Sequence, residues 1–170
     1  LPEPLAEGYR SEVLAQLPYW LQAVAGGMGD GAMLFVDYGH ARGEYYQPQR
    51  RDGTLRAFRQ HHLVGDVFAH PGLQDITAHV DFTAMAAAAV DADASVICYA
   101  PQAQFLLNAG LLQRLQAHPF ANEARRISAT GAVQKLLSPA EMGELFKVLV
   151  VGKGAMAADL KGFVQIDQSY

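Results

Sequence analysis

Two side chains that could do chemistry stand at the end of one apolar run. Residues 32–36 are apolar without alternation and lead into Asp37, Tyr38 and Gly39. A run of this kind predicts a strand buried on both faces, which is typical of parallel sheets. Ligands of open α/β sheets bind beyond the carboxyl ends of the strands, so Asp37 and Tyr38 are candidate site residues. An ordinary Asx turn after a buried strand explains the same pattern equally well.

A second group of polar side chains lies further along the chain, at alternate positions. If residues 74–80 are extended, one face of this segment carries Asp75, Thr77, His79 and Asp81. A row of carboxylates and an imidazole can hold a cation or tune a general base, whereas plain exposure to solvent gives the same pattern. Asp81 also precedes a helical stretch, so for this residue we favour the role of helix N-cap. Asp75 and His79 remain candidate site residues.

The histidines and the cysteine do not form a metal-binding motif. His61 and His62 are adjacent and would point to opposite faces of a strand. His70 and His79 follow at spacings that fit no common zinc pattern. Cys98 is the only cysteine and lies within an apolar run, which excludes a disulfide framework and a cysteine-rich metal site. We therefore expect no metal.

Composition limits the class of protein and its partners. The chain has 170 residues, of which 51% are hydrophobic and 18% charged, so we expect one cored domain. A net charge of -4 argues against a generic phosphate-binding surface, and we expect no nucleic-acid partner. The sequence contains neither an apolar run of membrane-spanning length nor a signal peptide, which predicts a soluble protein of a reducing compartment such as the cytoplasm.

Apolar periodicity predicts an α/β protein in which helices alternate with strands. Predicted helices cover residues 17–28, 82–91, 102–108, 111–117 and 121–136, and a capping box at residues 138–141 predicts a further short helix through Met142. Predicted strands cover residues 32–37, 54–59, 94–100 and 145–151, with a fourth core strand at the edge over residues 163–166. Trp20 is expected to anchor the core.

The segment between the first strand and the second helix, residues 41–80, is a long excursion. It contains five arginines and two adjacent tyrosines. Connections of this length are uncommon between sheet elements and often act as lids or binding loops. The arginines could cover an acidic ligand or an acidic protein segment, although a solvated face explains most of them.

Two common catalytic motifs are absent from the sequence. No phosphate-binding loop of the GxxxxGK[ST] or GxGxxG kind follows a strand, which argues against a nucleotide site of that type. No GxSxG elbow is present, so serine hydrolase chemistry has little support.

Five ordered motifs resemble one family of enzymes. They are LFVDYG, RDGTLRAFRQHH, PGLQDITAHVDFTAM, QAQFLLNAG and MGELFKVL, and they extend from about Gly8 to about Val151. Together they are similar to the MidA-like S-adenosylmethionine-dependent methyltransferases. That family is related to a mitochondrial assembly factor for respiratory complex I, which symmetrically dimethylates an arginine in a complex I subunit.

The resemblance implies a Rossmann-like class I methyltransferase fold, with a mostly parallel seven-stranded sheet and the cofactor S-adenosyl-L-methionine. Residues 32–37 then match the fifth strand, and residues 95–100 and 145–151 match the last two. The excursion at 41–80 and the helices at 101–143 match insertions near the active-site cleft. A protein substrate, such as a complex I subunit, is implied, in the cytoplasm or the mitochondrial matrix. A homodimer is left open.

The sequence departs from the family pattern at the cofactor site. The family's glycine-rich loop, which usually seats the cofactor at a helix N-terminus, and its acidic strand ends precede the matched region. The chain also begins with Leu1 in a loop-like segment, LPEPLAEG. We therefore expect the carboxyl-terminal half of a methyltransferase domain, inactive in isolation.

The mechanism implied by the family identifies what the candidate residues could do. Methyl transfer to arginine needs a guanidine nitrogen in line with the methyl donor and carboxylates that fix the guanidinium plane. The residues to test for this positioning are Asp37, Tyr38, Asp75 and His79, with Gln102 as a weaker candidate. Two other classes stay open: a non-catalytic assembly module that grips a partner through its arginines, and a small-molecule methyltransferase.

Overall fold

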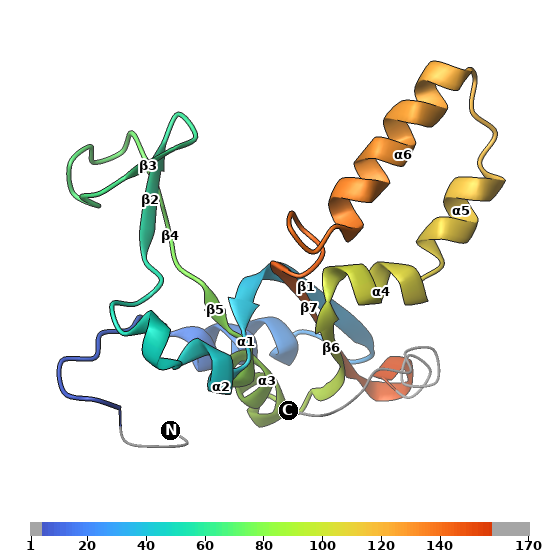
Figure 1. Ribbon diagram of the computed structural model, residues 1–170. Helices are drawn as coiled ribbons and strands as arrows, with labels where there is room; N and C mark the ends of the chain where they lie inside the picture. Colours follow the sequence, from blue (N-terminus) through green and yellow to red (C-terminus); the bar gives the residue numbers. More distant parts are fainter. Residues whose placement is uncertain (1–4, 158–170) are drawn as a thin grey trace.

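The computed structural model describes residues 5–157 (Figure 1). The helices are α1 (Leu17–Gly26), α2 (Arg42–Tyr45), α3 (Phe82–Asp91), α4 (Gln102–Asn108), α5 (Leu111–Ala117) and α6 (Glu123–Leu137), with a 3-10 turn at Pro48–Arg50. The strands are β1 (Gly31–His40), β2 (Arg56–Arg59), β3 (His62–Val64), β4 (Asp75–Thr77), β5 (Val80–Asp81), β6 (Ser95–Pro101) and β7 (Phe146–Lys153).

A four-stranded sheet in the order β5-β1-β7-β6 forms the body of the molecule. The strand β7 lies between β1 and β6 and is antiparallel to both, from Gly31↔Lys153 to Tyr38↔Phe146 on one side. It follows that β1 and β6 run parallel to each other and end at the same edge of the sheet. The short strand β5 adds in parallel to β1 only at that edge, through Gly39↔Val80 and His40↔Asp81.

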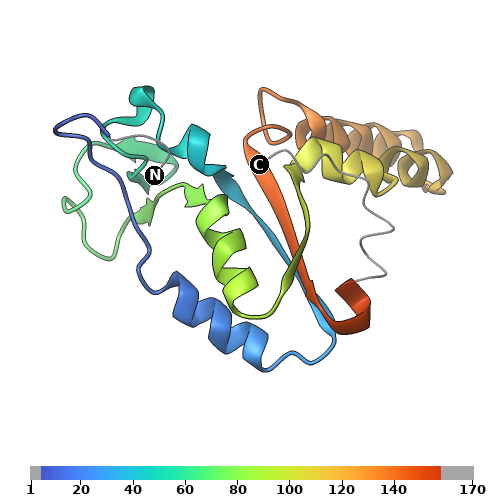
Figure 2. The ribbon, with the colours of Figure 1, turned by 90° about the horizontal axis from the view of Figure 1, so that it is seen from below.

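One face of the sheet is covered by helices. Figure 2 shows α1 and α3 side by side on that face. Their buried side chains, with Leu21 and Phe82 among the largest, pack on Leu149 and Val151 of β7. Asp81 caps α3, because its Oδ1 accepts a hydrogen bond of 2.9 Å from the amide of Ala84. The predictions of α3 and of this cap are confirmed.

Two segments, the β arm and the helical arm, project beyond the sheet. The β arm, residues 54–78, carries a small sheet in the order β3-β2-β4. The helical arm, residues 102–143, carries α4, α5 and α6. Figure 1 shows them as two separate projections from the body. The β arm follows β1 and α2, and the helical arm follows β6 directly, so both leave the sheet at its carboxyl edge.

The strand β1 differs from its prediction in burial and in pairing. Leu34 is 53% exposed and Val36 is 44% exposed, because on the face opposite to α1 and α3 the described residues cover β6 and β7, where Phe105 of α4 packs, but leave β1 open. Its main partner is antiparallel β7 rather than a parallel strand. The prediction of a strand buried on both faces in a parallel sheet is therefore wrong for the described residues.

Three further predictions have different outcomes. The short helix at residues 138–142 is wrong: these residues form turns, in which Ser138 O accepts from the amides of Glu141 and Gly143. The segment turns back on the end of α6, because a Cβ atom at Gly143 would lie 2.3 Å from the carbonyl oxygen of Leu137. Trp20 is 49% exposed rather than a core anchor, although its ring lies 6.0 Å from that of Phe35. The edge strand at 163–166 lies outside the described residues.

Candidate functional site

The polar side chains predicted from the sequence gather at the carboxyl edge of the sheet. Here β1 ends and the β arm begins, and Tyr38 pairs with Phe146 at the start of β7. Adjacent residues of a strand point to opposite faces. Asp37 accordingly lines a groove next to α1 and α2, whereas Tyr38 lines a cavity beneath the β arm.

The cavity beneath the β arm, called the arm cavity, has a volume of ≈ 630 Å³. Its lining residues are Tyr38, Phe58, Gln60, His61, Asp75 and Thr77. The Tyr38 hydroxyl makes a hydrogen bond to Oγ1 of Thr77, which ties the tip of β1 to β4. The tyrosine ring also contacts Phe146 and His79, each at a centroid distance of 5.6 Å.

Two histidine rings lie beside Tyr38 and are tilted relative to each other by 44°. The ring centroids of His40 and His79 are 5.1 Å apart. His40 makes a hydrogen bond of 3.1 Å through Nδ1 to Oε2 of Glu44, whereas Nδ1 of His79 is buried and has no hydrogen-bond partner. His79 is held through its backbone, because its amide donates to Oγ1 of Thr54 at 2.9 Å.

Burial favours the neutral form of both imidazoles. It is the main cause that lowers the pKa of His79, and the nearby charges of His40, Arg50 and Arg56 lower this pKa further. Burial also lowers the pKa of His40, although the hydrogen bond to Glu44 opposes this change. A neutral imidazole with an unpartnered buried nitrogen can accept a proton, which makes His79 the candidate base of this site.

The groove on the other side of β1 has a volume of ≈ 820 Å³. Asp37, His79 and Asp81 line it together with Trp20 of α1 and the tyrosines of the segment at 45–46. Arg42 Nε lies 3.6 Å from Oδ2 of Asp81, so this carboxylate both caps α3 and pairs with a cation. Burial raises the pKa of Tyr45 and of Tyr46.

A small polar network fixes the base of the β arm. Thr54 is 5% exposed and donates from its amide and its hydroxyl to Oε2 of Glu12, at 2.9 and 3.0 Å. The amide of Leu55 donates to the other carboxylate oxygen at 3.1 Å. Burial would raise the pKa of Glu12, but these hydrogen bonds outweigh burial and lower it. Glu12 therefore holds Thr54 in the position from which it supports His79.

The alternating row from Asp75 to Asp81 does not form one face. Ala78 and His79 separate β4 from β5, and the two strands belong to different sheets. Asp75 and Thr77 line the arm cavity, whereas His79 and Asp81 line the groove. The prediction of a single shared face is wrong, since the chain turns from the β arm into the body at this point. Tyr38 and His79 still contact each other across this break.

Sequence reasoning missed several residues of the site. His40 ends the same strand as Asp37 and Tyr38, so its position at the strand tip was a usable signal. Phe58 and Gln60 carry no chemical signature in the sequence, and only the fold brings them to Tyr38. Gln102 is buried and donates from Nε2 to the Leu136 carbonyl at 3.0 Å, which gives it a structural role within the helical arm.

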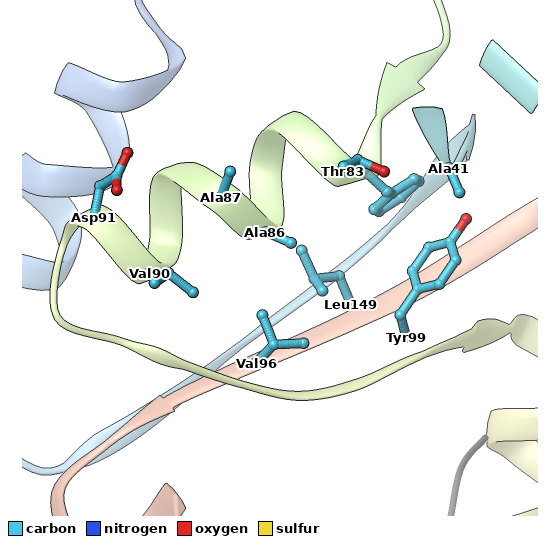
Figure 3. A pocket seen from close by; sticks show the side chains of 10 residues that line it. Ala41, Thr83, Ala86, Ala87, Val90, Asp91, Val96, Tyr99 and Leu149 are labelled. Atoms are coloured by element: carbon cyan, nitrogen blue, oxygen red, sulfur yellow. The ribbon is translucent and has the colours of Figure 1, made fainter. Parts of the chain in front are cut away.

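A third cavity, of ≈ 390 Å³, lies between α3 and β6. Figure 3 shows Val90, Val96 and Leu149 pointing into it, with Tyr99 and Thr83 near Ala41 at one end. Its lining is mainly apolar. Burial raises the pKa of Tyr99 to about 12, so its hydroxyl stays protonated at neutral pH. This cavity offers packing rather than acid–base chemistry.

Within residues 5–157 no group of three or more histidine, cysteine or carboxylate side chains is placed to hold a metal ion. No helix in the same part of the chain is both long enough and apolar enough to cross a membrane.

The fold and the site define a class of protein. Two strands end in parallel at one edge of a helix-covered sheet, and polar side chains gather at that edge. This is the arrangement of Rossmann-like α/β proteins that bind ligands beyond the carboxyl ends of their strands.

The comparisons with known proteins give the family. Residues 1–100 match the model of a family described as "Putative S-adenosyl-L-methionine-dependent methyltransferase". The chain belongs to this family, whose cofactor is S-adenosyl-L-methionine. The resemblance to methyltransferases and the α/β fold class are thereby confirmed.

Solved structures agree with this assignment. Two crystal structures from Burkholderia thailandensis are each 42% identical to this chain and cover 97% of it, with TM-scores of 0.86 and 0.85. The second contains bound S-adenosyl-homocysteine. The chain covers 44% and 42% of these two proteins.

Curated relatives are named as arginine methyltransferases. The protein arginine methyltransferase NDUFAF7, mitochondrial, of Danio rerio is 34% identical over 82% of this chain. Its homolog in Drosophila melanogaster is 36% identical over 76% of this chain. The chain spans 32% and 28% of the length of these two relatives.

The described residues fit only part of a cofactor site. The groove offers an aromatic wall, Trp20, beside Asp37, the carboxylate that is predicted to hold the acceptor. No glycine-rich loop joins a strand to a helix N-terminus in the form that usually binds the polar end of such cofactors, among residues 5–157. The described part of the chain therefore lacks the principal cofactor-binding element.

Proposed function

We propose that the complete gene product transfers a methyl group from S-adenosyl-L-methionine to an arginine side chain of a protein. The observation that carries this proposal is the 34% identity, over 82% of this chain, to a protein named as an arginine methyltransferase. A respiratory complex I subunit is the acceptor to test first. The mitochondrial names of the relatives support a mitochondrial location in a eukaryote, for which we propose the matrix. For a bacterium we propose the cytoplasm.

This chain would form the carboxyl-terminal part of one methyltransferase domain. The strand β5 pairs with β1 only at Gly39 and His40, so the rest of this edge of β1 is unpaired among the described residues, which supports a sheet that continues beyond β1. In this arrangement residues 41–80 and 101–143 are insertions at the active-site edge, and the first of them acts as a lid. The cofactor-binding half lies outside the chain.

The proposed roles of the site residues follow from the chemistry of a guanidinium group. This group is planar and carries five N–H donors, so a carboxylate can fix its plane while one nitrogen faces the methyl donor. Asp37 at the groove and Asp75 at the arm cavity are the two candidate carboxylates. Tyr38 lies next to Asp37 in the strand and would orient the acceptor between the groove and the arm cavity.

Methyl transfer to a guanidinium also releases a proton. The bound cofactor supplies an electrophilic methyl group, and its C–S bond breaks as the N–C bond forms. The acceptor nitrogen loses one proton, so that the methylated guanidinium keeps a single positive charge. His79 is the proposed acceptor of this proton, because its buried Nδ1 has no hydrogen-bond partner and its lowered pKa favours the neutral ring, which has a nitrogen free to accept.

The alternative of a non-catalytic module that grips a partner through arginines has less support. Arg50 donates to the Glu44 carbonyl and Arg56 donates to the Leu55 carbonyl. Arg59 makes a hydrogen bond to Nε2 of His70. These side chains are engaged with their own chain. A small-molecule methyltransferase differs from our proposal only in the acceptor.

Two measurements test the proposal. Titration calorimetry with S-adenosyl-L-methionine should detect binding by the complete gene product and none by the 170-residue chain. Radiolabelled cofactor should then transfer its methyl group to a protein acceptor, with dimethylarginine in the hydrolysate. Binding by the short chain would overturn the division into halves. Binding without methyl transfer would favour the non-catalytic module, and transfer only to small molecules would assign the other acceptor class.

The role of Asp37 has its own test. Asp37→Asn in the complete gene product should lower turnover with little loss of cofactor affinity, because the amide keeps the shape but not the charge of the side chain. An equal loss of cofactor affinity, or a loss of folding, would contradict a role in holding the acceptor.

A further inference from the structure

The arm cavity combines groups that recognise one kind of ligand. Two aromatic rings, those of Tyr38 and Phe58, line it from the body and from the arm. Asp75 contributes a carboxylate that makes no hydrogen bond or ion pair with the described part of the chain. Aromatic faces and an unpaired carboxylate attract a planar cation, the rings through their quadrupole and the carboxylate through paired hydrogen bonds.

The register of the small sheet explains why these groups meet. Phe58 of β2 lies directly opposite Asp75 of β4, and Arg56 lies opposite Thr77. Residues paired in this way point to the same face of a sheet. Thr77 in turn makes the hydrogen bond to the Tyr38 hydroxyl, so this face of the β arm is turned toward the tip of β1.

The positive charges of the β arm do not fill the cavity. The lining residues include neither Arg56 nor Arg59. Arg56 donates to the Leu55 carbonyl at 2.7 Å, and Arg59 lies on the opposite face of β2, next to His70. Asp75 therefore supplies the one full charge of the lining, and that charge is negative.

The turn between β2 and β3 supports a role in ligand binding. Gln60 and His61 have φ angles of 50° and 63°, and they form the two-residue loop between Arg59 and its partner His62. Loops of this kind favour Asn-Gly, since both residues adopt left-handed conformations. Residues other than glycine that adopt this backbone conformation store strain, and such strained residues are often found at functional sites. Here both side chains line the cavity.

We propose that the arm cavity is the acceptor subsite, in which Asp75 pairs with the guanidinium of the substrate arginine while Tyr38 and Phe58 contact its plane. This inference rests on the proposed function and names the residues that select its substrate. Gln60 and His61 of the turn line the same cavity. The same guanidinium chemistry could come from a protein side chain or from free arginine.

Kinetics of the complete gene product test the subsite. With an arginine-containing peptide as acceptor, Asp75→Asn should raise KM about tenfold or more, because a charge-assisted pair is lost. Phe58→Leu should raise KM about threefold through loss of the ring face. The dissociation constant of S-adenosyl-L-methionine, measured by calorimetry, should stay unchanged in both. Asp66→Asn, a carboxylate of the same arm outside the lining, is the matched control and should leave KM unchanged.

A double variant separates the turn from its side chains. Gln60→Asn with His61→Gly keeps the loop but shortens one lining side chain, removes the other and relieves the left-handed strain. We expect a higher melting temperature together with a higher KM for the peptide. A higher melting temperature with an unchanged KM would show that the turn has no part in acceptor binding.

Direct binding keeps the subsite testable without turnover. Methylguanidinium, free arginine and the arginine peptide are titrated against the complete gene product while the ring signals of Tyr38 and Phe58 are followed by NMR. Shifts that disappear in Asp75→Asn support the subsite even if no protein is methylated, in which case only the proposed function fails. Normal methyl transfer by Asp75→Asn, with an unchanged KM, overturns the subsite and leaves the proposed function intact. Tighter binding of the peptide than of free arginine identifies the protein as the source.

Discussion

The β arm and the helical arm leave the same edge of the sheet but relate to the body in different ways. The β arm turns one face toward Tyr38 and supplies most of the lining of the arm cavity. The hydrogen bonds at the base of the helical arm join its own two ends: Gln102 donates to the Leu136 carbonyl, and the Ala103 amide donates to the Gly143 carbonyl at 3.0 Å. None of the residues of α6 is buried. The comparison indicates that only the β arm takes part in the proposed chemistry.

The largest expected effect concerns Gly39, near the end of β1, where β5 joins the sheet. A Cβ atom at Gly39 would lie 2.2 Å from the carbonyl oxygen of Val80 and 2.9 Å from the Phe82 ring. Gly39→Ala should therefore separate β5 from β1 and cost about 3 kcal/mol of unfolding free energy, as overpacked sites do. Methyl transfer by the complete gene product should be lost.

Urea unfolding and the methyl-transfer assay measure these two effects. Gly43→Ala is the matched control, since a Cβ atom there meets nothing within 4 Å. Full activity in Gly39→Ala would show that the tip of β1 need not hold the β arm in place.

The corresponding glycine of the helical arm should give a different result. A Cβ atom at Gly143 would lie 2.3 Å from the Leu137 carbonyl oxygen, so Gly143→Ala should cost about 1–3 kcal/mol in the same unfolding assay. Methyl transfer to the arginine peptide should persist, because the helical arm lines neither the arm cavity nor the groove. Gly131→Ala, inside α6 with open space around it, is the control and should stabilise the protein slightly. A loss of activity in Gly143→Ala would remove the distinction between the arms.

A smaller effect is expected where the β arm joins the N-terminal segment. Thr54→Val removes the hydroxyl that donates to Glu12 and accepts from the His79 amide. Leaving these buried groups without a partner should cost about 1–2 kcal/mol. Thr54→Ser keeps the hydroxyl and should restore most of the stability in urea unfolding. If serine and valine give the same loss, the network at Glu12 contributes nothing.

The histidine pair predicts a pH dependence. The folded-state pKa values of His40 and His79 are lowered from 6.5, so the unfolded chain binds more protons than the folded chain just below that pH. Stability should be fully present above pH 6.5 and decline as the pH falls from 6.5 toward the lowered values. Urea unfolding between pH 5 and 8 checks this, and His79→Gln should flatten the curve. An unchanged curve in His79→Gln would mean that this ring titrates alike in both states.

The smallest expected effect belongs to the surface of α6. Ile127 is 62% exposed, so Ile127→Asn should change the unfolding free energy by less than about 0.5 kcal/mol. Peptide methylation should stay at the wild-type rate. A raised KM for the peptide would show that the helical arm also holds the acceptor.

Local patterns were sufficient to predict most of the body. The helix at Phe82–Asp91, its cap at Asp81 and the strands around Cys98 and Leu149 follow from apolar periodicity and capping signals, which depend on neighbouring residues. The exposed face of β1 could not be predicted in the same way. An apolar run reports that side chains will be covered but not which segment of a protein covers them.

The site was predicted only in part, for a physical reason. Asp37 and Tyr38 follow from their place at a strand end, whereas the contact between Tyr38 and Thr77 joins residues 39 positions apart in the chain. The break at Ala78–His79 assigns Asp75 to the arm cavity and His79 to the groove, which strict alternation could not reveal. These contacts depend on how the β arm folds back on the body, so they cannot be predicted from the pattern of neighbouring residues.

The most direct test of the account is a crystal structure of the complete gene product with S-adenosyl-homocysteine and an arginine peptide. We expect the guanidinium in the arm cavity, within hydrogen-bond distance of Asp75 and in contact with the rings of Tyr38 and Phe58. A guanidinium bound along α5 or α6, with an empty arm cavity, would contradict the central claim that the β arm holds the acceptor.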